Sequence, residues 1–408
     1  MMTTSFSSNR ASLLLRDLQE VEAAQQSLPT NNGENLQSIS IVVGHPRLIT
    51  PAAAENNNGT AFVSLKTLLQ SLSSYKSLQE IRLSIRGAGK SGTQEENTFS
   101  ADALAELLQI LSPSSLLISL ELVISKLQGS VTNLATAIQT CSSSLERVVL
   151  HECDTDTPRD GLLPLIHSLS QTERLQSLII ENVQFPVGDS TANALQKLAF
   201  HPHLQRLEIK QCDNLSDREL IPLVSSIRKL KHLKLSTGLF QLLTARTGGQ
   251  QQRPWGNALI QALAKTLSSW SNDNVCELTS LAITTTPDVD LMPIVQAMER
   301  NTSVKRLTLY NGKHNNNNDN NNNISMIQEM TRILTTQNMT LEHCNHLGGS
   351  FSEYETLAFY TRLNQCHRKE LWEHSHSCPQ QWWNLLLQEH QDHRIVHYLL
   401  SNHPGMIG

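Results

Sequence analysis

The spacing of apolar residues within the stretch 204–217 constrains the fold of this chain more than any other feature of its sequence. The stretch reads LQRLEIKQCDNLSD, with apolar residues at its first, fourth, sixth, ninth and twelfth positions. This alternation predicts a short half-buried strand, and the Ser-Asp pair that follows is typical of a helix start. The pattern recurs in nine further windows, which begin at Leu36, Leu78, Leu117, Leu145, Leu175, Leu230, Leu278, Val304 and Leu341. Such self-similarity predicts a repeat architecture in which each unit packs on its neighbours.

The distances between the windows set the size of the repeat. Five of the nine spacings lie between 26 and 30 residues, which indicates a period near 28. Apolar residues three or four apart predict helices over 103–111, 131–141, 162–169, 191–200, 220–227, 258–267 and 291–298. The longer spacings contain polar, Gly-, Pro- or Asn-rich insertions at 44–60, 86–97, 238–256 and 311–323. Because each insertion follows a strand, we expect all of them to project from one rim of the repeat domain.

The two ends of the chain depart from the repeat. Residues 11–27 are predicted to form a helix, with Leu13, Leu18 and Val21 on one face. From Phe351 onward, the pattern changes to that of three further helices. A solenoid needs caps at its open ends. The predicted organisation is therefore a helical N-terminal cap over 1–35, nine or ten repeats over 36–350, and a helical C-terminal cap over 351–408.

With a helix and a strand in each unit of about 28 residues, the stretch 36–349 resembles the ribonuclease-inhibitor-like class of leucine-rich repeat proteins. The tail segments FYTRLNQCHRKEL, QWWNLLL and IVHYLLSNHP are similar to the C-terminal segment of such proteins in unicellular algae. The resemblance implies an α/β solenoid of horseshoe shape, with a concave parallel β-sheet and convex α-helices, used mostly for binding other proteins. The class also holds enzyme inhibitors, innate sensors and activators of small GTPases, so the fold does not select a function.

The repeat register predicts which side chains line the concave face. Positions one, four and six point into the core, so positions three, five and seven project from the sheet. Neighbouring strands lie about 4.8 Å apart, which predicts a cationic cluster around Glu208. The predicted partner-binding residues are Arg147, His151, Glu181, Arg206, Glu208, Lys210, His232 and Lys234. Such a face favours a protein partner with an acidic surface; the alternative is a solvated polar face that binds nothing.

Composition argues against several other classes of protein. The net charge of −5 over 408 residues lacks the basic excess of a non-specific nucleic-acid binder. No stretch reaches the roughly 20 apolar residues of a membrane span. The seven cysteines lack paired spacing, which favours a reducing compartment. We expect a cytoplasmic protein, with a nuclear location or an organelle transit peptide as alternatives.

Motifs for catalysis and cofactor binding do not match. The sequence GAGKS at 87–91 has Ser84 where a phosphate-binding loop needs its first glycine. Nine of the sixteen histidines follow residue 342 without a recognised metal-ligand spacing, which leaves metal binding by the tail open. The sequence therefore predicts a protein-interaction scaffold with no catalytic activity and no cofactor. The alternative is an activator of a small GTPase, although such members carry an acidic C-terminal stretch and this tail is rich in His and Trp.

Overall fold

The chain divides into two compact units. The computed structural model describes residues 5–7, 10–27, 36–44, 58–75, 77–86, 98–124, 126–152, 161–212, 214–237, 255–269, 276–286, 288–311, 320–345, 351–365 and 393–402. Unit 1 comprises Met1–Leu230, Thr237–Leu239 and Gln250–Pro254. Unit 2 comprises Lys231–Ser236, Phe240–Gly249 and Trp255–Gly408.

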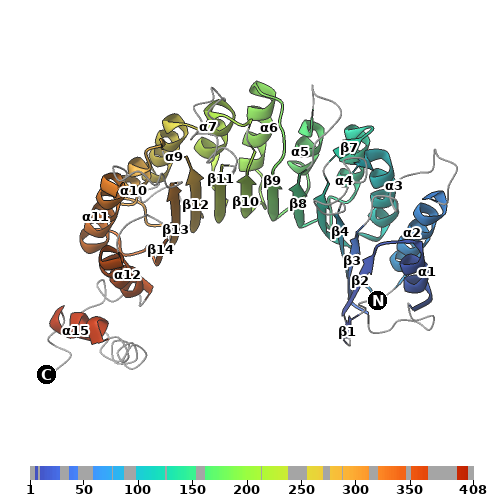
Figure 1. The fold of residues 1–408 in the computed structure, drawn as a ribbon, viewed down its shortest axis with the longest axis horizontal. Coiled ribbons are helices and arrows are strands. Elements are labelled where there is room, and N and C mark those ends of the chain that lie inside the picture. Colours follow the sequence, from blue (N-terminus) through green and yellow to red (C-terminus); the bar gives the residue numbers. More distant parts are fainter. Residues whose placement is uncertain are drawn as a thin grey trace. The chain divides into compact units, whose positions relative to one another are not determined.

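Unit 1 alternates parallel strands with helices that cover one face of its sheet (Figure 1). Its strands, in their order across the sheet, are β1 (Ser5–Ser7), β2 (Arg10–Leu15), β3 (Ser38–Val43), β4 (Glu80–Arg86), β6 (Leu117–Val123), β8 (Arg147–His151), β9 (Ser177–Glu181) and β10 (Arg206–Lys210). Only the β1–β2 pair is antiparallel in this part of the sheet. The short strands β5 (Thr98–Ser100) and β7 (Lys126–Gln128) pair with each other.

The helices of unit 1 lie beside one another over the sheet. They are α1 (Leu18–Ser27), α2 (Asn58–Ser73), α3 (Ala101–Leu111), α4 (Val131–Thr140), α5 (Leu163–Leu169), α6 (Asp189–Ala199) and α7 (Asp217–Ser226), with the 3-10 turn η3 (Ser112–Ser114). The core lies between the two layers, where alternate strand residues such as Val148 and Leu150 are fully buried. Because in-register strands repeat this alternation, the leucines stack into continuous rows.

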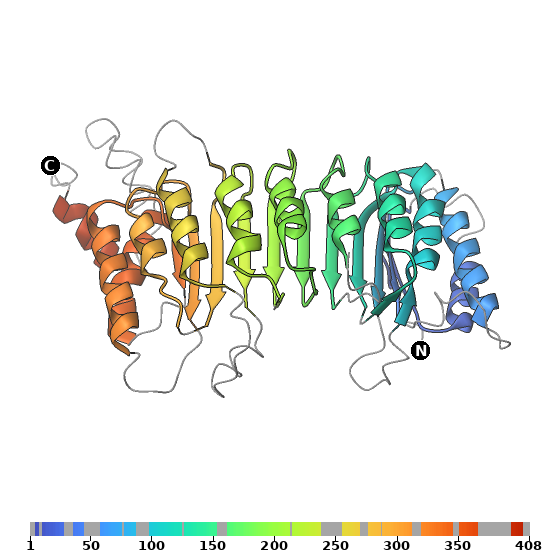
Figure 2. The ribbon, with the colours of Figure 1, turned by 90° about the horizontal axis from the view of Figure 1, so that it is seen from above.

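Unit 2 repeats the same architecture with fewer strands (Figure 2). Its strands are β11 (His232–Ser236), β12 (Ser280–Thr285), β13 (Arg306–Asn311) and β14 (His343–Asn345), and each pairs in parallel with the next. Its helices are α9 (Asn257–Ser269), α10 (Met292–Ala297), α11 (Asn320–Thr336), α12 (Phe351–Gln365) and α15 (His393–Asn402). The two units are thus built of α/β leucine-rich repeats.

All ten predicted repeat windows contain a strand, and all seven predicted helices are confirmed. The helix predicted over 11–27 is wrong in its first part, since Arg10–Leu15 forms β2 and pairs in parallel with β3. Ala11, Leu13 and Leu15 are buried at every second position, the period of a strand. The run of three leucines fits both periods, and only pairing with β3 decides between them.

Two further differences concern the insertions and the tail. Most residues of the four predicted insertions lie outside the described residues, but α2 begins at Asn58 and α11 at Asn320, inside two of them. In the tail, α12 and α15 confirm helical structure, whereas the tryptophan-rich stretch 379–390 lies outside the described residues.

Buried polar side chains hold the turns that lead into the strands. In unit 2, Asn301 accepts hydrogen bonds from the backbone N–H groups two and three residues on, at 3.1 and 2.9 Å from its Oδ1. Asn338 does the same at 3.0 and 2.9 Å, and its Nδ2 donates to the carbonyls of Met298 and Asn301. Asn301 Nδ2 likewise donates to the Leu267 carbonyl, at 3.1 Å. Each asparagine therefore closes its own turn and ties it to the preceding repeat.

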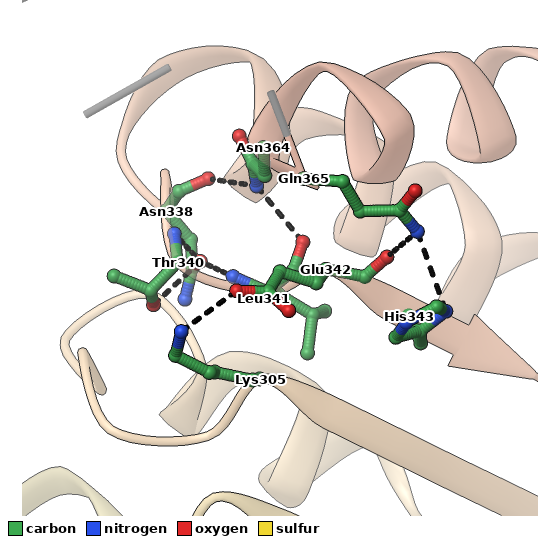
Figure 3. Close-up of polar contacts among 8 residues, drawn as sticks. All are labelled: Lys305, Asn338, Thr340, Leu341, Glu342, His343, Asn364 and Gln365. Atoms are coloured by element: carbon green, nitrogen blue, oxygen red, sulfur yellow. Dashed lines mark hydrogen bonds and ion pairs between the residues drawn. The ribbon is translucent and has the colours of Figure 1, made fainter. Parts of the chain in front are cut away.

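The asparagine pattern extends into the helix that follows β14. Asn364, in α12, donates from Nδ2 to the carbonyls of Asn338 and Leu341, at 3.2 and 2.9 Å (Figure 3). The neighbouring Gln365 donates to the carbonyl of Glu342 at 2.7 Å. Asn364 thus reaches back to the preceding turn as Asn338 does. The hydrogen-bond register of the repeats continues past the domain boundary predicted at residue 350.

Candidate partner-binding surface

Three rows of side chains cross the face of unit 1 that carries no helices. Parallel pairing aligns equivalent residues of β4, β6, β8, β9 and β10. The first row, which we term the arginine–serine row, consists of Arg82, Ser119, Arg147, Ser177 and Arg206. The central row consists of Ser84, Glu121, Val149, Ile179 and Glu208. The third row consists of Arg86, Val123, His151, Glu181 and Lys210.

The rows differ in exposure. Ser84, Ile179 and Glu208 of the central row are only 8, 8 and 3% exposed, because the side chains of the outer rows flank them. The side chains of Arg82 and Arg206 in the arginine–serine row remain 57 and 52% exposed. A partner that approaches this face would therefore meet the outer rows first.

Glu208 is the centre of an ion-pair network. The Nε atom of Arg206 donates to Glu208 Oε1 at 2.7 Å, and its guanidinium also forms an ion pair with this carboxylate. On the other side, Lys210 Nζ lies 3.5 Å from Glu208 Oε2. A buried carboxylate is costly unless it is paired and hydrogen-bonded. The two cations therefore stabilise Glu208 where it lies.

A second carboxylate joins the network from the neighbouring strand. Lys210 Nζ lies 2.6 Å from Glu181 Oε2, and His151 Nε2 lies 3.8 Å from Glu181 Oε1. Two cations, Arg206 and Lys210, thus meet two carboxylates, and their formal charges cancel. Within unit 1, Arg206 and Lys210 therefore add no net positive charge to the cationic cluster predicted around Glu208, because Glu181 and Glu208 are both within ion-pair reach.

Arg147 stands apart from this network. Its side chain is exposed, and its guanidinium forms no ion pair or hydrogen bond with any described residue. The hydroxyl groups of its row neighbours Ser119 and Ser177 also make no hydrogen bond within the described part of the chain. The middle of the arginine–serine row therefore offers donors that the described residues of the protein do not use.

The remaining predicted site residues, His232 and Lys234, belong to unit 2. His232 Nδ1 lies 2.9 Å from Ser280 Oγ, and Lys234 is half-buried without an ion pair to any described residue. Register pairing aligns His232 with Ser280, Arg306 and His343, and Lys234 with Ala282, Thr308 and Asn345. These two rows contain no Asp or Glu, in contrast to the face of unit 1.

Sequence reasoning missed two features of the unit 1 face. Alignment of the windows from their first leucines, Leu78 and Leu117, would place Arg82 opposite Glu121, whereas the structure pairs Arg82 with Ser119 and has a register irregularity between Ile81 and Arg82. Sequence reasoning also did not pair Arg86 with Glu121, whose side-chain atoms lie 3.2 Å apart across the two strands. No local pattern signals a register shift of this kind, since it depends on how the neighbouring strand pairs.

The described residues contain no group of three or more His, Cys, Asp or Glu side chains placed to hold a metal ion. The histidines and cysteine at 374–378, and His390, lie outside them. Burial raises the pKa of Cys141 and of Cys276 to about 11, so both are neutral thiols at physiological pH. No helix within the described ranges is long and apolar enough to span a membrane.

No protein-family model matches the chain, and no curated protein sequence matches it. Among solved structures, it is similar at 15% identity to a yeast complex of Rad7 and Elc1, with 82% of this chain and 81% of that chain covered and a TM-score of 0.34. It is also similar at 15% identity to a complex of TLR13 with the RNA ssRNA13, with 74% and 43% covered and a TM-score of 0.29. Similarity at this level transfers neither partner to this chain, and the ribonuclease-inhibitor-like subclass stays a prediction.

Proposed function

We propose that this protein is a non-catalytic scaffold that binds a protein partner through the helix-free face of its repeats and the adjacent rim insertions. The observation that carries the proposal is the middle of the arginine–serine row. Arg147, Ser119 and Ser177 present unused hydrogen-bond donors, in register, on three neighbouring strands. Residues of this kind on a rigid sheet favour recognition of a partner over a purely structural role.

The ion-pair network supports the same interpretation. Lys210 and Glu181 are 20 and 25% exposed. The ion pairs of Lys210 with Glu181 and with Glu208 restrict these side-chain rotamers before any partner arrives. Side chains that are ordered in advance lose less conformational entropy on binding. The network therefore orders the face beside Arg147, and exposed charges such as Arg147 would mainly set association rate and partner selectivity.

The decisive experiment compares two charge reversals. Arg147→Glu inverts the charge at the middle of the row. Arg218→Glu, in α7, is the control on the helical layer, because Arg218 is 63% exposed and its ion pair with Asp189 is a surface pair, of a kind that contributes little to stability. Both proteins would serve as bait in native lysate beside the wild type, with circular dichroism to verify folding. The proposal expects a specific protein to be lost only with Arg147→Glu. Equal recovery of that protein by all three baits would contradict it.

A broader reversal of Arg206, Lys210 and Lys234 would be harder to interpret. Removal of the two cations around Glu208 would leave a carboxylate that is 3% exposed without its partners. The loss of one partner of a buried ion pair typically costs about 3–5 kcal/mol. Reduced binding by such a variant would then reflect partial unfolding, whereas Arg147 has no described partner to disturb.

A further inference from the structure

We propose that the arginine–serine row of unit 1 binds an acidic segment of a partner in the polyproline II conformation, with a carboxylate at every third residue. The inference rests on the proposed function and names the chemistry of the partner. It depends on three properties of the row, which are the spacing of its arginines, the residues between them, and the charges that neighbour them.

The spacing of the row favours one backbone conformation. Arg82, Arg147 and Arg206 lie on every second strand, with Ser119 and Ser177 on the strands between. Strands of a sheet lie about 4.8 Å apart, so successive arginines are about 9.6 Å apart at their Cα atoms. A polyproline II helix has three residues per turn and rises about 3.1 Å per residue. Every third residue therefore faces the same side at about 9.3 Å, close to the arginine spacing.

Other regular conformations fit less well. An extended strand places residues on one face about 6.6 Å apart, or about 13 Å for alternate ones, from its rise of about 3.3 Å per residue. An α-helix laid across the strands brings neighbours on one face about 5–6 Å apart, or about 10.8 Å for every second turn, from its pitch of about 5.4 Å. Each of these periods differs from the arginine repeat of about 9.6 Å by more than the roughly 9.3 Å of polyproline II does, and the difference doubles over three arginines. The polyproline II conformation also exposes all backbone carbonyls, since it has no internal hydrogen bonds.

The serines fit the same ligand. Ser119 and Ser177 are half-buried, and their hydroxyls have no described hydrogen-bond partner. Because a serine side chain is short, it leaves room between the arginines for the ligand backbone to approach the sheet. The hydroxyls can then donate to the carbonyls that a polyproline II segment leaves exposed.

Charge complementarity selects acidic residues at the repeated positions. Arg147 has no counter-ion among the described residues. Arg82 has only an exposed contact, at 3.5 Å, with Glu80, and such surface pairs contribute little. Arg206 is bound to Glu208 but remains 52% exposed, and a guanidinium has five donors. Three carboxylates could therefore each receive charge-assisted hydrogen bonds along the row.

The test uses two labelled peptides of identical composition and the whole protein. In the first, Glu-Pro-Pro repeats separate three glutamates by two prolines each; in the second, the three glutamates are contiguous and flanked by the prolines. Fluorescence anisotropy would measure both affinities for the wild type, Arg147→Gln and the control Arg218→Gln. We expect the spaced peptide to bind the wild type about tenfold more tightly than the contiguous one. Arg147→Gln should lower the affinity for the spaced peptide about tenfold, and Arg218→Gln should leave it unchanged. Added salt should weaken this binding.

The outcomes separate this inference from the proposed function. If both peptides bind equally, net charge alone acts and the inference is overturned. If neither peptide binds, or if Arg147→Gln leaves the affinity of the spaced peptide unchanged, the inference is also overturned. In each of these cases, loss of a lysate partner with Arg147→Glu but not Arg218→Glu would still support the proposed function. If that loss fails while the spaced peptide binds through Arg147, the row recognises this ligand class but the captured partner uses another surface.

Discussion

Unit 1 and unit 2 use different side chains to close equivalent turns that lead into their strands. In unit 2, Asn301 accepts the backbone N–H groups two and three residues on, and donates from Nδ2 to the Leu267 carbonyl. In unit 1, His201 Nδ1 accepts the N–H groups of His203 and Leu204, while its Nε2 contacts the Thr172 carbonyl at 2.6 Å. A carbonyl only accepts, so Nε2 carries the proton. The turn therefore needs one acceptor and one donor, whichever residue supplies them.

A turn closed by histidine depends on pH, and a turn closed by asparagine does not. The amide of Asn301 does not titrate, whereas His201 closes its turn only as the neutral imidazole. Burial, at 3% exposure, is the main cause that lowers the pKa of His201 below its ordinary value. The second contrast lies on the helix-free faces, where unit 1 buries the charged Glu208 and the aligned rows of unit 2 carry no acid. Unit 1 should therefore respond more strongly to pH and to changes of charge.

The largest expected effect is that of Asn338→Ala in unit 2. Asn338 is 3% exposed, and its side chain makes four hydrogen bonds to backbone groups. Its removal leaves several buried backbone groups without partners, each costing about 1–3 kcal/mol. We expect the free energy of unfolding to fall by about 3–5 kcal/mol, as measured by amide hydrogen exchange in β13 and β14. Asn345→Ala, at an exposed position of β14, is the control. A loss below about 1 kcal/mol would refute this role of the asparagines.

The next largest effect is the difference in stability loss between two lysine substitutions, one on the helix-free face of each unit. Lys210→Met removes the cation between Glu181 and Glu208, so two carboxylates would face each other without it. Lys234→Met removes a lysine with no described ion pair. We expect a loss of about 2 kcal/mol for Lys210→Met and at most about 0.5 kcal/mol for Lys234→Met, from urea denaturation. Equal losses would mean that the network around Glu208 does not distinguish the two faces.

The histidine turn predicts a pH dependence that is specific to unit 1. Because the pKa of His201 is lower in the folded chain than in the unfolded chain, the unfolded state binds more protons in acid. Stability is therefore full above about pH 6.5 and falls as the pH drops below it, by at most about 1.4 kcal/mol per pH unit. His201→Asn should remove this component from urea-denaturation midpoints between pH 7 and 5, whereas His203→Asn should remove only the smaller part that the charge of His203 contributes. An unchanged profile in His201→Asn would disprove the assignment.

The smallest effect concerns backbone strain. Glu152, Asn182 and Gln211 each follow a strand of unit 1 with φ of 57, 52 and 55°, and no non-glycine residue in the described part of unit 2 has a positive φ. Glycine adopts this left-handed region without the steric penalty of a Cβ atom, which costs about 1–2 kcal/mol. The greater freedom of glycine in the unfolded chain offsets part of this relief of strain, so we expect Gln211→Gly to give a net stabilisation of about 0.5 kcal/mol in thermal unfolding. Destabilisation would show that the Gln211 side chain outweighs its strain.

The sequence by itself determined the repeat, its period and the direction in which each strand residue points. Leu204, Leu207 and Ile209 carry this information locally, because alternation along a strand and spacing along a helix are properties of neighbouring residues. The windows from Leu36 to Leu341 consequently all contain strands. The predicted site residues of unit 1 follow from the same alternation, and their exposure agrees with it outside the central row.

Only the tertiary structure decided which of these side chains remain available. Lys210 is neutralised because Glu181 reaches it from the neighbouring strand, although 29 residues separate the two in sequence. Likewise, the Leu13 segment is a strand because β3 pairs with it, and His201 takes the place of Asn301 because its ring nitrogens meet the same backbone groups. These outcomes depend on contacts between repeats. A local pattern predicts which way a residue points, but its charge balance is set by what the adjacent repeat places beside it.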